Sequence, residues 1–367
     1  MNTDTSWYEK LDKVHQYPAK FPLELASKYI LEYSKPEDIV FDPFVGSGTT
    51  LLSASINDRY SYGIDINPIA VLLSKFKITY YSENALVNLD RFLSKLKCTD
   101  TFSYHGDLYD YKGIDHWFTS DVIKSLSCIK NEIETTFEEN TPEEIFSKVV
   151  FSSIVNLVSN QESDTRYAAV EKDGLTAEYV LTCYCKKFTQ IKKIIENITR
   201  SEEISSHSNA YLYNSKNSTD IIGNSKVNLI VTSPPYPNTY DYYLYHKHRM
   251  MWLGYDFKDS KGSEIGSRNE FSSHKQPSSN FTDDLKTILC ECDKTMVHDA
   301  HAVIIIGDGI IRGELYDSLE HTLDICEEIG WKLEESSFVN LDQTSKSFNK
   351  GFRTKGKKEH TIIFRKS

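Results

Sequence analysis

Two short turns in this chain hold the residue types that could bind a nucleotide and transfer a group from it. The first follows the apolar residues 39–41, and it reads Asp42-Pro43-Phe44-Val45-Gly46-Ser47-Gly48-Thr49. Glycines between a strand and a helix let a ligand approach the backbone, and Asp65 ends the next apolar segment, where a carboxylate can meet ribose hydroxyls. The pattern predicts an adenosine site, with an ordinary glycine turn as the alternative.

The same turn argues against two common phosphate-binding loops. It contains no GxxxxGK[ST] signature, which disfavours a P-loop. The segment GSGTTL does not complete GxGxxG, which weakens a dinucleotide site. This motif alone does not decide which other nucleotide cofactor the turn would bind.

The second turn reads Thr232-Ser233-Pro234-Pro235-Tyr236 and follows the apolar residues 227–231. Its two prolines stiffen the backbone and remove two N–H donors, so carbonyl acceptors and the Ser233 hydroxyl form a fixed array. Such an array suits an exocyclic amino group, whose nitrogen lone pair it would hold toward an electrophile while Tyr236 stacks on the heterocycle. The alternative is that the prolines simply end a strand.

Together the two turns resemble the S-adenosylmethionine-dependent amino methyltransferases of DNA, the family that modifies cytosine N4 or adenine N6. DPFVGSGT looks like the cofactor loop of that family, and TSPPY looks like its catalytic turn. HQYPAKFP at 15–22 is similar to its N-terminal cofactor motif, and GIDINP at 63–68 to its ribose-binding strand end. Asn214 and Ser215 stand where the family usually has an acidic residue against adenine, which departs from its pattern.

The resemblance covers residues 1–80 and 206–367, and it implies S-adenosylmethionine as the cofactor, duplex DNA as the partner and three groups of site residues. The implied catalytic residues are Ser233, Pro234, Pro235 and Tyr236. The implied cofactor-binding residues are Tyr17, Pro18, Ala19, Lys20, Phe21, Asp42, Pro43, Phe44, Gly46, Ser47, Gly48, Thr49, Asp65, Ile66, Asn67, Asn214 and Ser215. The candidate DNA-binding residues are Asn238, Asp241, Lys247, Arg249, Lys350, Arg353 and Lys355.

The resemblance also implies a mechanism. The target base would leave its stack, the Ser233 hydroxyl and the Pro234 carbonyl would accept hydrogen bonds from its amino group, and Tyr236 would stack on it. In the family, Ser before Pro-Pro-Tyr goes more often with cytosine N4 and Asp with adenine N6, so cytosine N4 is the expected target. Carbon-5 methylation is not supported, because no cysteine lies in a nucleophile motif.

Charge limits how the chain could meet nucleic acid. Its 42 basic and 53 acidic side chains give a net charge of −11, which argues against indiscriminate binding to phosphate. A local exception is the run 346–358, which holds six basic residues and no acidic one; it predicts a contact to the DNA backbone, with a solvated loop as the alternative. A helix around 246–253 offers Lys247 and Arg249 to phosphate, with a merely solvated basic face as the alternative.

The remaining pattern predicts an α/β chain with a Rossmann-like class I methyltransferase fold. Its main feature is a seven-stranded doubly wound sheet. A helical insertion at 81–205, in which no strand is expected, would serve target recognition or dimerisation. The expected strands are 39–41, 61–65, 210–213, 227–231, 302–306, 331–341 and 360–364. The expected helices include 22–33, 49–55, 176–200, 282–297 and 314–329, with a surface loop at 256–280 and a capped helix start at 141–144.

Other features bound the class of protein. No apolar run approaches the roughly 20 residues that span a bilayer, and the start lacks a secretory signal, so a cytoplasmic location is expected. The seven cysteines show no CxxC spacing, and His246 and His248 lack a third ligand, so no metal site is predicted. A cognate restriction endonuclease is a further candidate partner, whereas the recognised DNA sequence and the oligomeric state are not readable.

Three rival functions remain at this stage. An adenine-N6 or RNA amino methyltransferase could use the same turn. A non-catalytic nucleic-acid-binding protein with a vestigial cofactor pocket is opposed by the retention of Asp42, Gly46, Asp65 and the whole SPPY turn. A nicotinamide oxidoreductase is the weakest rival, because it leaves the Pro-Pro turn unexplained.

Overall fold

The computed structural model describes residues 5–101, 104–163, 166–198, 201–341 and 356–367. The chain forms two compact units. The sheet unit consists of Ala19–Ser74, Glu203–Tyr242 and Asp259–Ser367, and the helical unit consists of Met1–Pro18, Lys75–Glu202 and Tyr243–Lys258.

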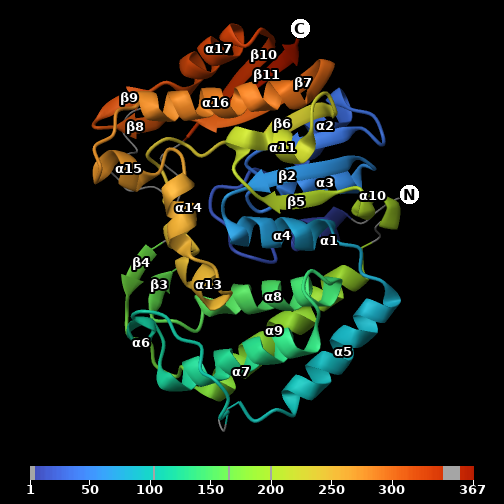
Figure 1. Cartoon of the computed structure of the whole chain (residues 1–367), viewed down its shortest axis with the longest axis vertical. Helices are drawn as coiled ribbons and strands as arrows, with labels where there is room; N and C mark the ends of the chain where they lie inside the picture. Colours follow the sequence, from blue (N-terminus) through green and yellow to red (C-terminus); the bar gives the residue numbers. More distant parts are fainter. Residues whose placement is uncertain (1–4, 102–103, 164–165, 199–200, 342–355) are drawn as a thin grey trace. The chain divides into compact units, whose positions relative to one another are not determined.

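A seven-stranded sheet organises the sheet unit (Figure 1). Its strands, in spatial order, are β10 (Trp331–Asn340), β11 (Lys358–Lys366), β7 (Met296–Gly307), β6 (Val227–Thr232), β1 (Ile39–Asp42), β2 (Tyr60–Asp65) and β5 (Asn209–Leu212). All neighbours pair in parallel except β11, which is antiparallel to both β7 and β10. This order confirms the predicted doubly wound, Rossmann-like class I fold, and all seven predicted strands lie in the sheet.

Helices cover both faces of the sheet because successive strand residues point to opposite sides. On one face Val40, Leu229 and Val303 pack against α2 (Leu23–Tyr33) and α3 (Thr49–Ile56). On the other face Phe41 and Ile230 belong to a core shared with α11 (Ser218–Ile222), α16 (Ser279–Thr295) and α17 (Ser318–Glu328). The sheet unit also holds η1 (Ser215–Asn217), α15 (Arg268–Ser272) and the hairpin of β8 (Gly309–Ile311) and β9 (Glu314–Tyr316).

The helical unit is a bundle with an aromatic core. It contains α1 (Thr5–Asp12), α5 (Glu83–Lys97), α6 (Ile114–Trp117), α7 (Ser120–Thr136), α8 (Pro142–Val155), α9 (Ala177–Glu196) and α13 (Lys247–Trp252). The rings of Phe146 and Phe188, on α8 and α9, meet edge to face at 4.8 Å. Thr141 caps α8 by accepting a hydrogen bond from the Glu144 amide, as its sequence predicts. The helices α4 (Pro68–Ile78), α10 (Glu202–Ser206), α12 (Tyr242–Tyr245) and α14 (Phe257–Ser263) include residues of both units.

Three local predictions were wrong. The region 256–280 is not a plain loop, because it contains α14 and α15, and Ser267 caps α15 through the Glu270 amide. The predicted helix 314–329 starts only at Ser318, where Asp317 caps it, and its first residues form β9 instead. The helical insertion also carries a hairpin of β3 (Gln161–Ser163) and β4 (Arg166–Ala169), whose short strands give little periodicity to detect.

Two further expectations concern cysteines and membranes. All seven cysteines are free thiols, and Cys292 and Cys326 are fully buried packing residues of the sheet unit. Among the described residues, no helix combines the length and the apolar character that a bilayer crossing needs.

Candidate functional site

The glycine turn lies at the carboxyl end of β1, where Asp42 begins it. The Asp42 side chain is buried and accepts hydrogen bonds from the Phe44 amide at 3.0 Å and from the Thr232 hydroxyl at 2.7 Å. Burial raises the pKa of Asp42 to about 6, against the effect of these hydrogen bonds. The carboxylate therefore organises the turn rather than facing solvent.

Gly48 ends this turn in a conformation that other residues avoid. Its φ is 80°, and a Cβ atom there would lie 2.7 Å from the Cα atom of Ser74 on α4. Glycine thus lets two backbones meet behind the loop.

Replacing Gly48 by alanine should destabilise the sheet unit. We expect about 1–2 kcal/mol from the left-handed backbone alone and a further loss from the contact with Ser74. Denaturant unfolding would measure it. The matched control is Gly330→Ala, which has the same backbone strain at a φ of 86° but no heavy atom within 4 Å. Equal losses in the two variants would contradict the contact argument.

Asp65 joins the end of β2 to the glycine turn. Its carboxylate accepts from the Gly46 amide at 2.9 Å and from the Asn67 amide at 2.8 Å, and Asn67 in turn accepts from the Ile69 amide at the start of α4. Burial raises the pKa of Asp65 to about 6. The carboxylate has about four lone pairs, and the amides of Gly46, Asn67 and Ile66 occupy at most three of them, so the group can still accept from a ligand.

The segment after β5 closes on the same turn. Ser215 is buried and donates its hydroxyl to the Pro43 carbonyl at 2.5 Å. Asn214 caps η1 by accepting from the Lys216 amide. The predicted cofactor residues from β1, β2 and β5 are therefore brought together by named hydrogen bonds, with Ser215 serving as a tie between loops.

The second turn begins beside the first, although about 190 residues separate them in the chain. Strands β1 and β6 are parallel neighbours, with Phe41 opposite Ile230, and both turns leave the same end of the sheet. The bond from Thr232 to Asp42 connects the residue before Ser233 directly to the glycine turn. The two motifs that carry the predicted chemistry thus share one edge of the sheet.

Two neighbouring strands, β7 and β11, hold the Tyr236 ring. The phenol donates to the Glu359 carboxylate at 2.5 Å, and the ring edge lies against Gly307, where a Cβ atom would come within 2.5 Å. Burial first, and the charge of Glu359 second, hold the pKa of the Tyr236 phenol well above its ordinary value. Sequence reasoning missed Glu359, because its position opposite Gly307 depends on the pairing of β7 with β11, which no local motif indicates.

The residues after the second turn are structural in this conformation. Asn238 has a φ of 56° and donates its amide to the Ile310 carbonyl at 2.5 Å. Asp241 is buried and accepts from the Asn269 amide at 2.8 Å, which ties it to α15. Both positions therefore fix the loop that follows Tyr236, and their contact with a base stays a prediction.

Several predicted residues belong to the helical unit. Tyr17 stacks on His246 with ring centroids 4.9 Å apart, and the Lys247 ammonium lies over the Tyr167 ring. Arg249 is 1% exposed, and its guanidinium donates to the carbonyls of Ser152 and Tyr245. This burial corrects the prediction that Arg249 contacts a phosphate, because its guanidinium donates to backbone carbonyls inside the helical unit.

The N-terminal motif divides between the two units. Tyr17 and Pro18 belong to the helical unit, whereas Ala19, Lys20 and Phe21 belong to the sheet unit. Phe21 packs beside the core that α2 and α3 form with the sheet. Its role toward the cofactor stays a prediction.

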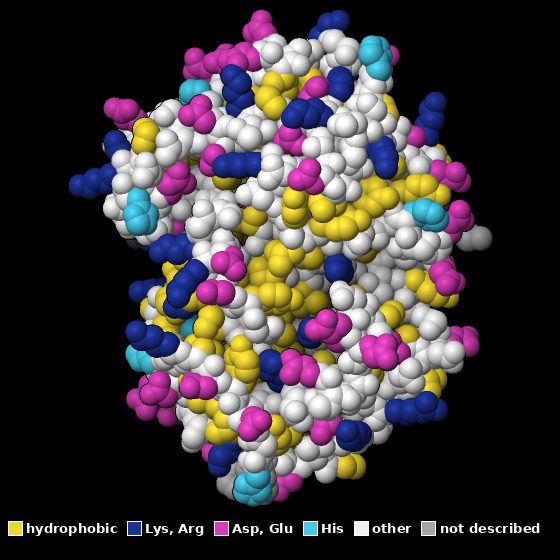
Figure 2. All heavy atoms as spheres, in the orientation of Figure 1, with side chains coloured by type: hydrophobic (Ala, Val, Ile, Leu, Met, Phe, Trp, Pro, Cys, Tyr) yellow, Lys and Arg dark blue, Asp and Glu magenta, His cyan; other side chains and the backbone are white. Residues whose placement is uncertain are grey.

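No broad basic surface marks a DNA contact on the face drawn in Figure 2, where Lys and Arg side chains are interspersed with Asp and Glu. Lys350, Arg353 and Lys355 lie outside the described residues, so their predicted contact with DNA stays a prediction. At the described end of this run, Lys357 is buried, and the Lys358 ammonium lies over the Phe338 ring at 4.2 Å.

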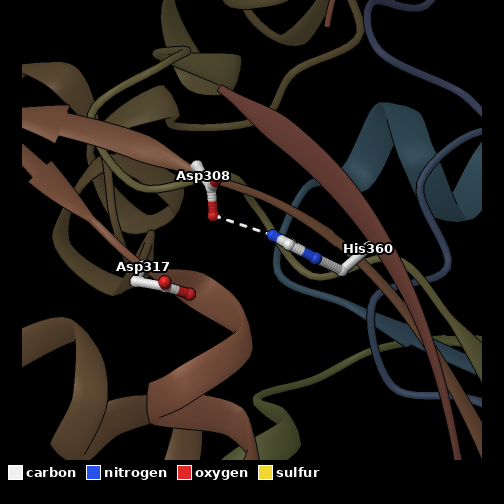
Figure 3. Close-up of side chains that lie close together, drawn as sticks. All are labelled: Asp308, Asp317 and His360. Atoms are coloured by element: carbon white, nitrogen blue, oxygen red, sulfur yellow. Dashed lines mark hydrogen bonds and ion pairs between the residues drawn. The ribbon is translucent and has the colours of Figure 1, made fainter. Parts of the chain in front are cut away.

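Asp308, Asp317 and His360 form a cluster that could be mistaken for a metal centre (Figure 3). Their ligand atoms all lie within 4.8 Å of one another. However, Asp308 already accepts from the amides of Ser318 and Lys358, and its Oδ1 lies 3.1 Å from His360 Nε2. Asp317 caps α17. These bonds account for the cluster as a tie between β7, α17 and β11.

The sequence of this chain is similar to those of known DNA methylases and type II methyltransferases. A family model described as DNA methylase matches residues 2–76. The type II methyltransferase M.MvaI of Kocuria varians is 29% identical over 285 residues, covering 71% of this chain and 60% of the relative. M.MjaII of Methanocaldococcus jannaschii, also a type II methyltransferase, is 23% identical over 391 residues, covering 80% and 71%.

A shorter match is closer in sequence. The orphan methyltransferase M.BamHII of Bacillus amyloliquefaciens is 52% identical over 58 residues, covering 16% of this chain and 22% of the relative. The chain thus spans 60% of the length of M.MvaI and a smaller share of M.BamHII.

Proposed function

Because this chain belongs to the DNA amino methyltransferase family, we propose that it transfers a methyl group from S-adenosylmethionine to an exocyclic amino group of a base in DNA. The observation that carries the proposal is the hydrogen bond between Thr232 and Asp42. It joins the second turn, which would bind the target base, to the glycine turn, which would bind the cofactor. We propose cytosine N4 as the target, on the resemblance of the Ser233-Pro234-Pro235-Tyr236 turn.

The residues of the first turn fit an adenosine-bearing cofactor. Gly48 lets the turn pack closely on Ser74 of α4, which fixes the shape of the loop, and Asp65 has acceptor capacity beyond its bonds to Gly46 and Asn67. Asp65 would accept from the ribose hydroxyls, and the backbone of the turn would approach the ligand closely. The cofactor supplies an electrophilic methyl group on a sulfonium centre.

The second turn would bind the base that receives the methyl group. A base in duplex DNA must leave its stack to reach a protein site, at a cost of a few kcal/mol. The Ser233 hydroxyl and the Pro234 carbonyl would accept hydrogen bonds from the amino group, and Tyr236 would stack on the ring. Holding the nitrogen lone pair toward the methyl group would accelerate the transfer, because the reacting atoms are already oriented.

Incubation of the protein with labelled cofactor and either duplex DNA or RNA tests the substrate class. Label in DNA is the expected result, whereas label only in RNA would favour the RNA amino methyltransferase as the second candidate. Binding of cofactor and DNA without any transfer would favour the non-catalytic alternative. A partner endonuclease is proposed only from the type II relatives, and it would cut the same sequence when the DNA is unmethylated.

Cofactor binding should weaken in mild acid. The ionised Asp65 accepts from ribose hydroxyls, and its pKa of about 6 means that protonation removes this acceptor below that pH. We expect the affinity for S-adenosylmethionine to fall by about tenfold per pH unit below about pH 6. Calorimetric titration across that range measures it.

Two variants identify the titrating group, because Asp42 has the same pKa of about 6. Asp65→Asn should abolish the pH dependence, whereas Asp42→Asn should keep it, since Asp42 bonds to Thr232 and Phe44 rather than to the ligand. The reverse pattern would assign the dependence to Asp42.

A further inference from the structure

Glu359 makes a contact that the proposed reaction does not yet use. Its carboxylate lies on β11 and accepts the Tyr236 phenol at 2.5 Å, across 123 residues of sequence. Because the phenol oxygen is the atom of Tyr236 farthest from the backbone, a bond there limits both tilt and rotation of the ring. The hydrogen bond is charge-assisted and short, which places it among the stronger kinds.

The opposite constraint on the ring comes from the residue paired with Glu359. In the antiparallel ladder between β7 and β11, Glu359 lies opposite Gly307. A Cβ atom at Gly307 would come within 2.5 Å of the Tyr236 ring, so the ring edge rests on the strand backbone. The Gly307–Glu359 pair thus constrains the ring twice: the Gly307 backbone contacts the ring edge, and the Glu359 carboxylate binds the hydroxyl.

The backbone on both sides of Glu359 is itself fixed. Asp308 accepts from the Lys358 amide at 2.9 Å, its own amide donates to the Lys358 carbonyl at 2.8 Å, and its carboxylate faces His360. Figure 3 shows the Asp308 carboxylate pointing at the His360 ring. Lys358 and His360 are the two chain neighbours of Glu359, so the cluster that resembles a metal site immobilises the anchor of Tyr236.

The structure assigns Glu359 as a positioning residue for target-base stacking: it fixes the Tyr236 ring through the phenol. This inference rests on the proposed function, because the ring has a task only if a base stacks on it. Glu359 acts as a hydrogen-bond acceptor and does not touch the base. The Asp308–His360 pair holds the strand from which it acts.

The test compares two substitutions that differ only in the acceptor. Glu359→Ala removes the acceptor and should lower kcat for DNA methylation by about tenfold, with the cofactor dissociation constant unchanged. Glu359→Gln retains an amide oxygen that can accept from the phenol, so it should restore kcat to within about threefold of the wild type. If Glu359→Gln is as slow as Glu359→Ala, the charge and not the hydrogen bond matters, and the assignment is wrong.

A double-mutant cycle separates positioning from a general structural role. Tyr236→Phe removes the hydroxyl, so adding Glu359→Ala to it should change kcat by less than about twofold. A structural role would make the two losses multiply. Gly307→Ala, which pushes the ring from the other side, should also lower kcat, whereas Gly262→Ala, with no heavy atom within 4 Å, should not.

The wild-type protein in the same assay distinguishes failure of the Glu359 assignment from failure of the proposed function. If the wild type methylates DNA and Glu359→Ala matches its kcat, only the positioning role is refuted. If the wild type transfers no methyl group to DNA, the proposed function fails, and the inference fails with it.

Discussion

Replacing Ser233 by alanine is expected to lower the rate of methyl transfer by at least about 100-fold while leaving cofactor affinity nearly unchanged. The hydroxyl is the side-chain acceptor that the proposal assigns to the target amino group, and the two prolines that follow it have no polar side-chain atom that could replace it. Since Ser233 makes its side-chain hydrogen bond to the Tyr236 phenol, within its own turn, the cofactor site should persist. Single-turnover methylation of duplex DNA and calorimetry with S-adenosylmethionine give the two quantities.

A serine elsewhere in the same unit provides the control. Ser337 is exposed on β10, and Ser337→Ala should match the wild type in both measurements. If Ser233→Ala instead weakens cofactor binding and leaves transfer intact, the assignment of the two turns to cofactor and base is reversed.

Replacing Asp65 by alanine should have the opposite effect: cofactor affinity should fall strongly and the rate of methyl transfer only slightly. The variant loses the acceptor for the ribose hydroxyls and also frees the Gly46 and Asn67 amides that shape the turn. Because each hydrogen bond to a charged group contributes about 1.5–3 kcal/mol, we expect cofactor affinity to fall by at least about 100-fold. Transfer at saturating cofactor should fall much less than in Ser233→Ala.

The control for Asp65 is an exposed carboxylate that also accepts a hydrogen bond within the sheet unit. Asp220 on α11 accepts the Tyr213 phenol at 2.9 Å and belongs to neither turn. Asp220→Ala should bind S-adenosylmethionine like the wild type. An unchanged affinity in Asp65→Ala would remove this residue from the proposed cofactor site.

The sheet was predictable because its strands are short apolar runs bounded by turn residues. Residues 39–41, 61–65 and 227–231 could be recognised locally, and parallel pairing then brings the turns after β1 and β6 to one edge. The glycine turn was also predictable from local residues, because its backbone requires glycine. Gly48 has a positive φ and lies close to Ser74, and both features exclude a side chain.

The anchor of Tyr236 was not predictable, because it depends on register. Glu359 meets the phenol only because β11 runs antiparallel to β7 with Glu359 opposite Gly307, and no local pattern sets that pairing. Arg249 failed for a related reason. Its place in a basic tetrapeptide suggested solvent, but tertiary packing buries its stem and directs its donors to two carbonyls.

The most direct test of the central claim identifies the modified nucleoside. Duplex DNA is incubated with the protein and labelled S-adenosylmethionine, digested to nucleosides and analysed by mass. The account predicts label in N4-methylcytosine. Label in N6-methyladenine would keep the amino methyltransferase and correct the base, whereas label in 5-methylcytosine, or no label in DNA, would contradict the account.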